Sequence, residues 1–265
     1  MLIHVLRFLP DEAIDMEAAM AGQPNTGLIA VLAIALAGVL WFSVPERAER
    51  ALDYSVKIQI ALADETKKGQ FLYGSGTVIG HTRTRFGRWS ITHSIILTSA
   101  HVIQPGNPSA LTIVWNDSRM SGKIIPGSVD VGRDLALIEV SATLPVAPLF
   151  FDGTQNGEPV IAIGNQFRLG LIISDGRAGP EYTVASEDYE RFEISAPSYW
   201  GSSGGGVFAW HYGRLGLVGV ILSIPRHPIT IMFLEMPILI HVPVTTITDA
   251  RPMRIVEEYL AEYGF

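Results

Sequence analysis

Cysteine is absent from the 265 residues of this chain. Its absence excludes disulfide bonds, thiolate catalysis and cysteine-ligated zinc sites. The fold must therefore be stabilised by core packing, for which a 48% share of apolar residues is ample. The absence of cysteine leaves the compartment open.

Basic residues are also few, with 19 Lys and Arg against 26 Asp and Glu and a formal charge of -7. Binding to phosphate groups needs clustered basic residues, and we identify no basic stripe with interleaved aromatics, so nucleic acid is not expected as a partner. The seven histidines show no HExxH spacing. We therefore expect neither a metal ion nor another cofactor.

One long uncharged run lies near the N-terminus. Residues 27–44 read GLIAVLAIALAGVLWFSV, and these 18 residues at about 1.5 Å each approach the roughly 30 Å of a bilayer core. A cleaved signal peptide is disfavoured because the preceding region is acidic and no small-x-small cleavage site follows. A buried core helix is the remaining alternative. We expect a single transmembrane anchor over residues 26–44, preceded by a tail of residues 1–25.

From about residue 51 the sequence consists of short β-rich runs separated by Gly, Pro, Asn and Asp. Such runs without a long helical pattern between them indicate an all-β barrel or sandwich. Residues 246–265 differ, because Val256, Tyr259 and Leu260 have the spacing of an amphipathic C-terminal helix. The predicted strands are 55–62, 71–79, 94–97, 111–115, 135–140, 160–163, 192–195, 206–210, 216–222 and 229–233.

The segment GSSGGG at residues 201–206 has the features of a nucleophile turn. Amide hydrolysis by a serine needs an exposed hydroxyl, an imidazole base, a carboxylate that orients it, and N–H donors for the oxyanion. Glycines on both sides of Ser203 permit backbone angles closed to other residues. A flexible linker is the alternative, and the apolar pair that follows, Val207-Phe208, argues against it. With Ser203 as nucleophile, the N–H groups of Gly201 and Ser203 would form the oxyanion hole.

His101 and Asp134 supply the other two side chains. His101 follows an apolar strand and Asp134 opens another. Taken alone, each has an ordinary structural explanation. The order His101, Asp134, Ser203 is that of chymotrypsin-type enzymes and not of subtilisins or α/β-hydrolases. The gaps of 33 residues (101 to 134) and 69 residues (134 to 203) suit a histidine and aspartate from one barrel and a serine from a second.

Four sequence blocks carry a family resemblance, and these are Gly74–Ile79 with Leu97–Val102, Asp134–Ile138, Ala162–Phe167 and Gly201–Gly206. They resemble the corresponding blocks of HtrA/Deg-type trypsin-like serine proteases of the chymotrypsin clan. The resemblance covers residues 52–245 and implies an all-β fold of two six-stranded antiparallel β-barrels with the triad between them. It also implies polypeptide substrates and a protease domain at 52–245, behind the N-terminal transmembrane helix and before a short C-terminal helix at 246–265.

The sequence departs from the family at three points. Ser202 replaces the usual Asn or Asp, so activation through a newly formed N-terminus is not expected. Gly206 replaces Pro, which would loosen the loop after Ser203. Only residues 246–265 follow the matched region, so no peptide-binding PDZ module is expected there.

The substrate pocket is expected beside Ser203 and on the strand that follows it. We assign Trp200, Leu222, Ser223 and Ile224 to its walls, and no carboxylate occurs at these positions. A buried substrate cation would lack a partner there. Cleavage after small or apolar residues is therefore expected, and cleavage after Lys or Arg is not. Alternatively, Leu222 and Ile224 belong to the core.

The resulting prediction is a membrane-anchored serine endopeptidase that forms an acyl-enzyme on Ser203. Two alternatives stay open. The first is a catalytically silent binding or sensor module, suggested by Ser202 and Gly206. The second is a self-processing protease of narrow substrate range.

The side of the membrane and the oligomeric state depend on weaker signals. Arg47, Arg50 and Lys57 follow the apolar run and only Arg7 precedes it, which favours a cytoplasmic main domain. The family resemblance favours an extracytoplasmic catalytic domain, and we expect that side. The sequence leaves the oligomeric state open, and a homo-oligomer is one alternative because trimers are common among the relatives.

Overall fold

The computed structural model describes residues 48–63, 66, 69–104, 106–183, 188–223, 226–233, 236–243 and 246–265. Residues 48–265 form one compact unit. The tail of residues 1–25 and the anchor predicted at 26–44 lie outside the described residues. Within the described ranges, no helix has the length and apolar character needed to cross a membrane.

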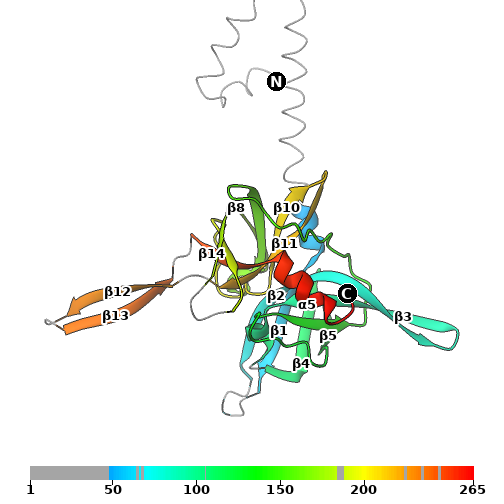
Figure 1. Ribbon diagram of the computed structural model, residues 1–265. Coiled ribbons are helices and arrows are strands. Elements are labelled where there is room, and N and C mark those ends of the chain that lie inside the picture. The colour runs from blue at the N-terminus through cyan, green and yellow to red at the C-terminus, as the bar shows by residue number, and fades with distance from the viewer. Residues whose placement is uncertain are drawn as a thin grey trace, which may run out of the picture. The chain divides into compact units, whose positions relative to one another are not determined.

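The first half of this unit is a closed barrel of six antiparallel strands (Figure 1). Their order around the barrel is β1-β2-β3-β6-β5-β4. In β1, Val56, Ile58 and Ile60 are fully buried and alternate with more exposed residues, since successive side chains of a strand face opposite sides. The strands are β1 (Ser55–Leu62), β2 (Phe71–Phe86), β3 (Trp89–Thr98), β4 (Gly106–Trp115), β5 (Ser118–Ile124) and β6 (Ala136–Val140).

The second half is another closed six-stranded barrel, with the order β10-β11-β14-β9-β8-β7. The prediction of two six-stranded antiparallel barrels is therefore confirmed. Its strands are β7 (Pro159–Asn165), β8 (Leu171–Tyr182), β9 (Arg191–Ile194), β10 (Gly206–His211), β11 (Arg214–Ser223) and β14 (Thr248–Pro252).

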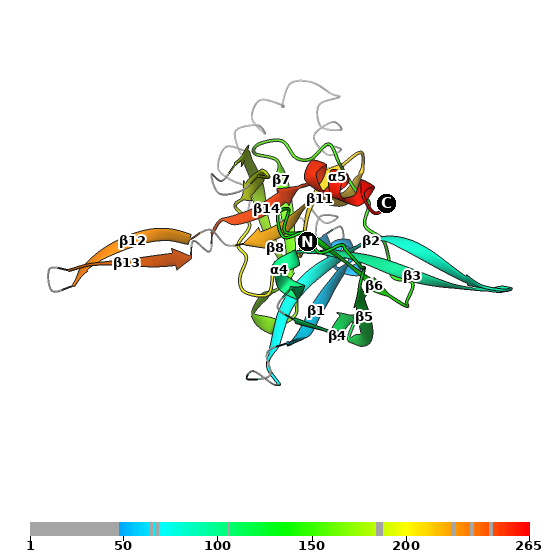
Figure 2. The ribbon, with the colours of Figure 1, turned by 60° about the horizontal axis from the view of Figure 1, so that its bottom comes forward.

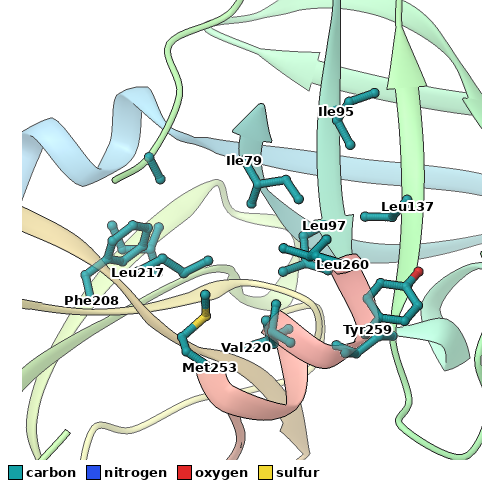
Figure 3. Packing of buried hydrophobic residues seen from close by; sticks show 14 of the residues in the cluster. Ile79, Ile95, Leu97, Leu137, Phe208, Leu217, Val220, Met253, Tyr259 and Leu260 are labelled. Atoms are coloured by element: carbon teal, nitrogen blue, oxygen red, sulfur yellow. The ribbon is translucent and has the colours of Figure 1, made fainter. Parts of the chain in front are cut away.

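A C-terminal helix, α5 (Met253–Ala261), packs into the core that the two barrels share. Its buried side chains contact residues of β2, β3 and β6 from the first barrel and of β10 and β11 from the second (Figure 3). This cluster stabilises the barrel pair by burying apolar surface, in a chain that has no disulfide to do so. The cluster includes Ile79, Leu97, Leu137, Phe208, Leu217, Val220, Met253, Val256, Tyr259 and Leu260.

Two hairpins project from the barrels on opposite sides (Figures 1 and 2). One is the outer part of β2 and β3, which remain paired as far as Phe86 and Trp89. The other is β12 (Arg226–Phe233) with β13 (Met236–Pro243), a separate two-stranded sheet inserted between β11 and β14.

Several strands differ from the sequence-based ranges. Among the described residues, β5, β8, β13 and β14 were not predicted. The strand β14 occupies residues 248–252, inside the range assigned to the C-terminal helix, so helix α5 begins only at Met253. The sequence of β14 contains Asp249 and Arg251, both nearly fully buried and both held by polar partners described below. A hydrophobicity pattern does not detect a buried strand whose charged residues are paired in this way.

Candidate active site

His101 lies in a one-turn helix, α4 (Ala100–Ile103), directly after β3 ends at Thr98. Ser99 and Ala100 before it are almost completely buried, and the Ser99 hydroxyl donates to the Ile221 carbonyl of β11 at 3.0 Å. The small residues thus let the first barrel approach the second at this point. The side chain of His101 remains 47% exposed and accessible.

Asp134 lies in the turn before β6 and makes two contacts with His101. One carboxylate oxygen accepts the His101 backbone N–H at 2.9 Å, and the other lies 2.8 Å from Nδ1 of the ring. The two contacts fix both the backbone and the ring of the histidine relative to one carboxylate. The contact at Nδ1 favours the tautomer with its proton on Nδ1, in which Nε2 keeps its lone pair. Asp134 itself has a φ of 55°, a left-handed conformation that the turn imposes.

The turn that carries Asp134 is held on several sides. Asp130 pairs with Leu135 across its base through backbone hydrogen bonds of 2.9 and 3.0 Å. Arg133 forms ion pairs with Asp130 and with Glu262, and these carboxylates raise the pKa of its guanidinium. From the second barrel, Nε of the buried Arg251 donates to the Arg133 carbonyl at 2.8 Å.

Ser203 lies in the loop between β9 and β10. It lines a cavity of about 890 Å³ together with His101 and Asp134. Its carbonyl accepts the backbone N–H of Ser75 on β2 at 2.9 Å. The structure therefore places all three predicted catalytic residues around one open cavity where the two barrels meet.

Three of the four sequence blocks meet at this loop, because Ser75 of the first block binds Asn165 and Gly201 of two others. The Ser75 hydroxyl donates to the Gly201 carbonyl at 2.7 Å and accepts the Asn165 N–H at 2.8 Å. The Ser75 carbonyl accepts from the Thr98 hydroxyl at 2.7 Å. Because Ser75 is fully buried, these bonds are shielded from water.

The glycines of these blocks are required by close backbone contacts. A Cβ on Gly201, whose φ is 96°, would lie 2.2 Å from the Asn165 carbonyl oxygen. A Cβ on Gly164 would lie 2.6 Å from the backbone of Ser202. No side chain fits at either position without moving the nucleophile loop.

The loop presents two backbone donors that have no partner. Phe167 donates its N–H to the Trp200 carbonyl at 2.8 Å, which turns that carbonyl toward Phe167. In a trans peptide the N–H points opposite to the C=O, so the Gly201 N–H is directed away from Phe167. Within the described part of the chain, neither Gly201 N–H nor Ser203 N–H donates to another residue. Two free donors beside Ser203 are what an oxyanion hole requires.

The departures at Ser202 and Gly206 are accommodated locally. The buried Ser202 closes a tight turn, with its N–H donating to the Tyr199 carbonyl at 3.0 Å and its hydroxyl accepting the Tyr199 N–H at 3.3 Å. Gly206 does not leave the loop loose, because it pairs with Val220 and Ile163 as the first residue of β10.

The cavity includes three of the four residues assigned to the substrate pocket, Trp200, Leu222 and Ser223. Trp200 is 73% exposed at the rim, whereas Leu222 is almost completely buried. Ile224 lies outside the described residues.

Sequence reasoning missed a polar cluster beside Ser223. Arg191, which lines the cavity, lies 3.2 Å from the Asp249 carboxylate and donates to the Ser223 hydroxyl at 3.2 Å. The Tyr182 hydroxyl also donates to Asp249, and burial together with this carboxylate raises its pKa. Asp249 is thus a carboxylate near the pocket wall that is already bound by a cation. Its distance in sequence from Ser203 left no signal that could have placed it here.

An aromatic cluster at the rim was also missed. Phe167 packs on Tyr199 and Trp200, with ring centroids 4.8 and 6.2 Å apart, and Arg168 lies over the Tyr73 ring. Phe167 and Arg168 both have positive φ, a conformation that is costly for large residues and is typical of functional loops. Among the described residues, no group of three His, Asp or Glu side chains is placed to hold a metal ion.

Comparison with known proteins identifies a trypsin-like fold. A sequence profile of the trypsin-like peptidase domain matches residues 74–220, which is more than half of the chain. Among solved structures, the active form of the Rv3671c protease from M. tuberculosis is similar with a TM-score of 0.60 and 17% identity, covering 83% of this chain and 86% of that one. An HtrA-type protease, AlgW, in a structure with a tripeptide, has a TM-score of 0.61 and 18% identity, covering 82% of this chain and 62% of that one.

At sequence identities of 17% and 18%, the similarity to these two solved structures shows a shared fold only. No curated protein matches the chain in sequence. The profile match and the two closed barrels nevertheless agree, and the chain belongs to the trypsin-like peptidase domain family.

Proposed function

We propose that this protein is a serine endopeptidase that cleaves polypeptides through an acyl-enzyme on Ser203. His101 Nε2 accepts the Ser203 proton and later protonates the leaving amine. Asp134 orients the ring and stabilises its charged form. The N–H groups of Gly201 and Ser203 bind the oxyanion of the tetrahedral intermediate.

The observation that carries this proposal is the double contact between Asp134 and His101 at the same cavity as Ser203. The carboxylate holds both the backbone N–H and Nδ1 of His101, at 2.9 and 2.8 Å. A structural histidine needs no such orientation. The unpartnered donors at Gly201 and Ser203 supply the remaining element of the chemistry.

The finer features of the proposal concern substrate and location. Arg191 forms an ion pair with Asp249, and Asp134 is bound to His101, so no free carboxylate remains among the described residues at the cavity. This supports cleavage after small or apolar residues. The uncharged run of residues 27–44 supports a single-pass anchor. The resemblance to HtrA/Deg-type proteases supports a protease domain outside the cytoplasm. A protease-protection assay on spheroplasts tests this location.

The decisive experiment combines an active-site probe with hydrolysis of casein by the full chain. We expect a fluorophosphonate probe to label Ser203, and Ser203→Ala to lose both labelling and hydrolysis. Ser118→Ala, at an exposed turn, serves as the matched control and should retain both. A wild-type protein that is folded yet neither labelled nor active would contradict the proposal and favour the silent binding module.

The same material separates a general protease from a self-processing one. Mass spectrometry of the chain with and without Ser203→Ala shows whether its own peptide bonds are cut. Labelling with self-cleavage but no casein hydrolysis would restrict the proposed function to self-processing.

A further inference from the structure

The tip of the β2–β3 hairpin, defined here as residues 83–91, projects away from the first barrel (Figures 1 and 2). The cavity contacts the other end of β2, at Phe71 to Tyr73. The 13 residues from Tyr73 to Phe86 span up to roughly 40 Å at about 3.3 Å per residue. The hairpin tip is therefore separate from the candidate active site and has no part in the proposed chemistry.

The hairpin tip concentrates positive charge in an otherwise acidic protein. Arg83, Arg85 and Arg88 are all exposed, and no ion pair joins any of them to another described residue. Residues 66–116 contain no Asp or Glu, although the whole chain carries a formal charge of -7. The net charge of the chain conceals this local basic cluster.

The hairpin tip also exposes apolar surface. Trp89 is 81% and Ile91 is 45% exposed. The register pairs Arg85 with Ser90 and Thr84 with Ile91, so Arg83 and Arg85 share one face of the hairpin while Trp89 and Ile91 share the other. The hairpin tip is thus cationic on one face and apolar on the opposite face.

We propose that the hairpin tip is a docking surface for the anionic phospholipid headgroups of a membrane. Arginines are attracted to an acidic lipid surface, and indole rings favour the boundary between headgroups and acyl chains. A hairpin that enters this boundary end-on engages both of its faces at once. An acidic peptide or a nucleic acid bound by Arg83 and Arg85 would leave Trp89 in water on the far side.

The test uses the absence of cysteine from the chain. A single Ser90→Cys substitution in the full-length protein gives one labelling site on the hairpin tip, which is modified with an environment-sensitive nitrobenzoxadiazole dye. Vesicles are phosphatidylcholine alone, or phosphatidylcholine with phosphatidylglycerol as roughly a third of the lipid. We expect the emission of the dye at position 90 to become brighter and blue-shifted only with the anionic vesicles. Because the dye reports on the hairpin tip itself, insertion of another segment of the chain into the vesicle does not produce this signal. A label at Ser118→Cys, in the β4–β5 turn, should not respond.

Charge removal then identifies the residues responsible. In the labelled protein, Arg83→Gln with Arg85→Gln should weaken docking roughly fivefold per arginine. Trp89→Ser should weaken it with less dependence on salt. The matched pair Arg119→Gln with Arg214→Gln changes the net charge equally at exposed positions elsewhere and should leave docking intact. Circular dichroism of each variant confirms that it is folded.

Three results would overturn the proposal. The first is an equal response of the Ser90 label to neutral and anionic vesicles. The second is equal weakening by the matched pair. The third is a response to polyglutamate or a DNA oligomer in lipid-free solution as large as the response to anionic vesicles. All three are independent of peptide hydrolysis, so they leave the proposed protease activity untouched.

Discussion

At the scale of single residues, the buried hydroxyl of Ser75 joins the parts of the candidate site that come from different barrels. It donates to the nucleophile loop at Gly201 and accepts from the β7 end at Asn165. A hydroxyl suits this position because it both donates and accepts, and no apolar residue of similar size can replace both bonds.

Ser75→Ala should lower kcat by about tenfold to a hundredfold and the free energy of unfolding by about 1–3 kcal/mol, because two buried backbone groups lose their partner. Steady-state hydrolysis and thermal melting measure the two effects. Ser94→Ala is the matched control, since Ser94 is also buried and bridges Ala142 and Leu144 away from the cavity. An equal loss of kcat in the control would show that Ser75 acts through stability alone.

Gly201→Ala should reduce kcat at least about a hundredfold, the usual cost of losing an oxyanion donor, because its Cβ would displace the loop from Asn165. Gly213→Ala also places an alanine at positive φ, but nothing lies near its Cβ, and it should keep full activity. Probe labelling and hydrolysis measure both variants. Retained activity in Gly201→Ala would remove Gly201 from the oxyanion hole.

Single residues also show how much of the candidate site could be predicted from the sequence. His101, Asp134 and Ser203 were predicted from their order and spacing, and the structure brings them to one cavity. The N–H groups of Gly201 and Ser203 were also predicted, as donors to an oxyanion. The role of Ser75 and the Arg191–Asp249 pair could not be predicted. Each depends on atoms that are distant in sequence and whose approach is set by the packing of the barrels.

At the scale of elements, most strands rich in apolar residues were predicted, although β13, MPILIHVP, was missed. Two of the strands that were missed are poor in apolar residues. The range of β1 matches the prediction at both ends. The strands β5, SRMSGKI, and β14, TDARP, carry few apolar residues and are identified only by their pairing with neighbouring strands. The hairpin portion of β2 and β3 was missed because its exposed residues follow no core-facing pattern.

Helix α5 gives the clearest test at this scale, because Tyr259 is buried and donates its hydroxyl proton to the Ser128 carbonyl. Burial raises the pKa of Tyr259 above its value in the unfolded chain, about 10. The stabilisation is therefore complete below pH about 10 and declines as the pH rises above it, since the unfolded chain then loses its proton first. Denaturant unfolding across this pH range measures the effect.

Tyr259→Phe should lower the free energy of unfolding near pH 7 by about 1–2 kcal/mol and make its decline above pH about 10 less steep. Tyr263→Phe, which removes a more exposed hydroxyl bonded to Gly127, is the control and should change both quantities less. An unchanged alkaline slope in Tyr259→Phe would contradict the assigned role of this hydroxyl.

At the scale of the whole molecule, the alignment of the two barrels determines the geometry of the candidate site. Ser99, Ser75 and Arg251 each bond across from one barrel to the other. Arg251 is completely buried yet donates to the carbonyls of Arg133, Tyr189 and Glu190. A buried guanidinium satisfied by carbonyls in both barrels fixes their relative position and, through Arg133, the turn that holds Asp134.

Arg251→Leu should therefore reduce kcat more than it changes KM, since substrate contacts stay while Asp134 loses its positioning. It should also lower the free energy of unfolding by about 3 kcal/mol or more, because buried carbonyls are left unpaired. Arg251→Lys retains the charge and should recover part of the lost kcat and part of the lost free energy of unfolding. If Arg251→Leu proved equally stable and active, the barrels would be aligned by apolar packing alone.

The position of α5 and its neighbours along the chain has a consequence for biosynthesis. Translation produces Ser203 and His101 well before Arg251, Tyr259 and Glu262, yet these later residues anchor the turn of Asp134 and complete the shared core. A nascent chain that lacks these later residues therefore contains His101 and Ser203 but not the contacts that hold the turn of Asp134. The proposed protease activity is therefore expected only after the segment that forms β14 and α5 has left the ribosome, because these elements complete the second barrel and the shared core.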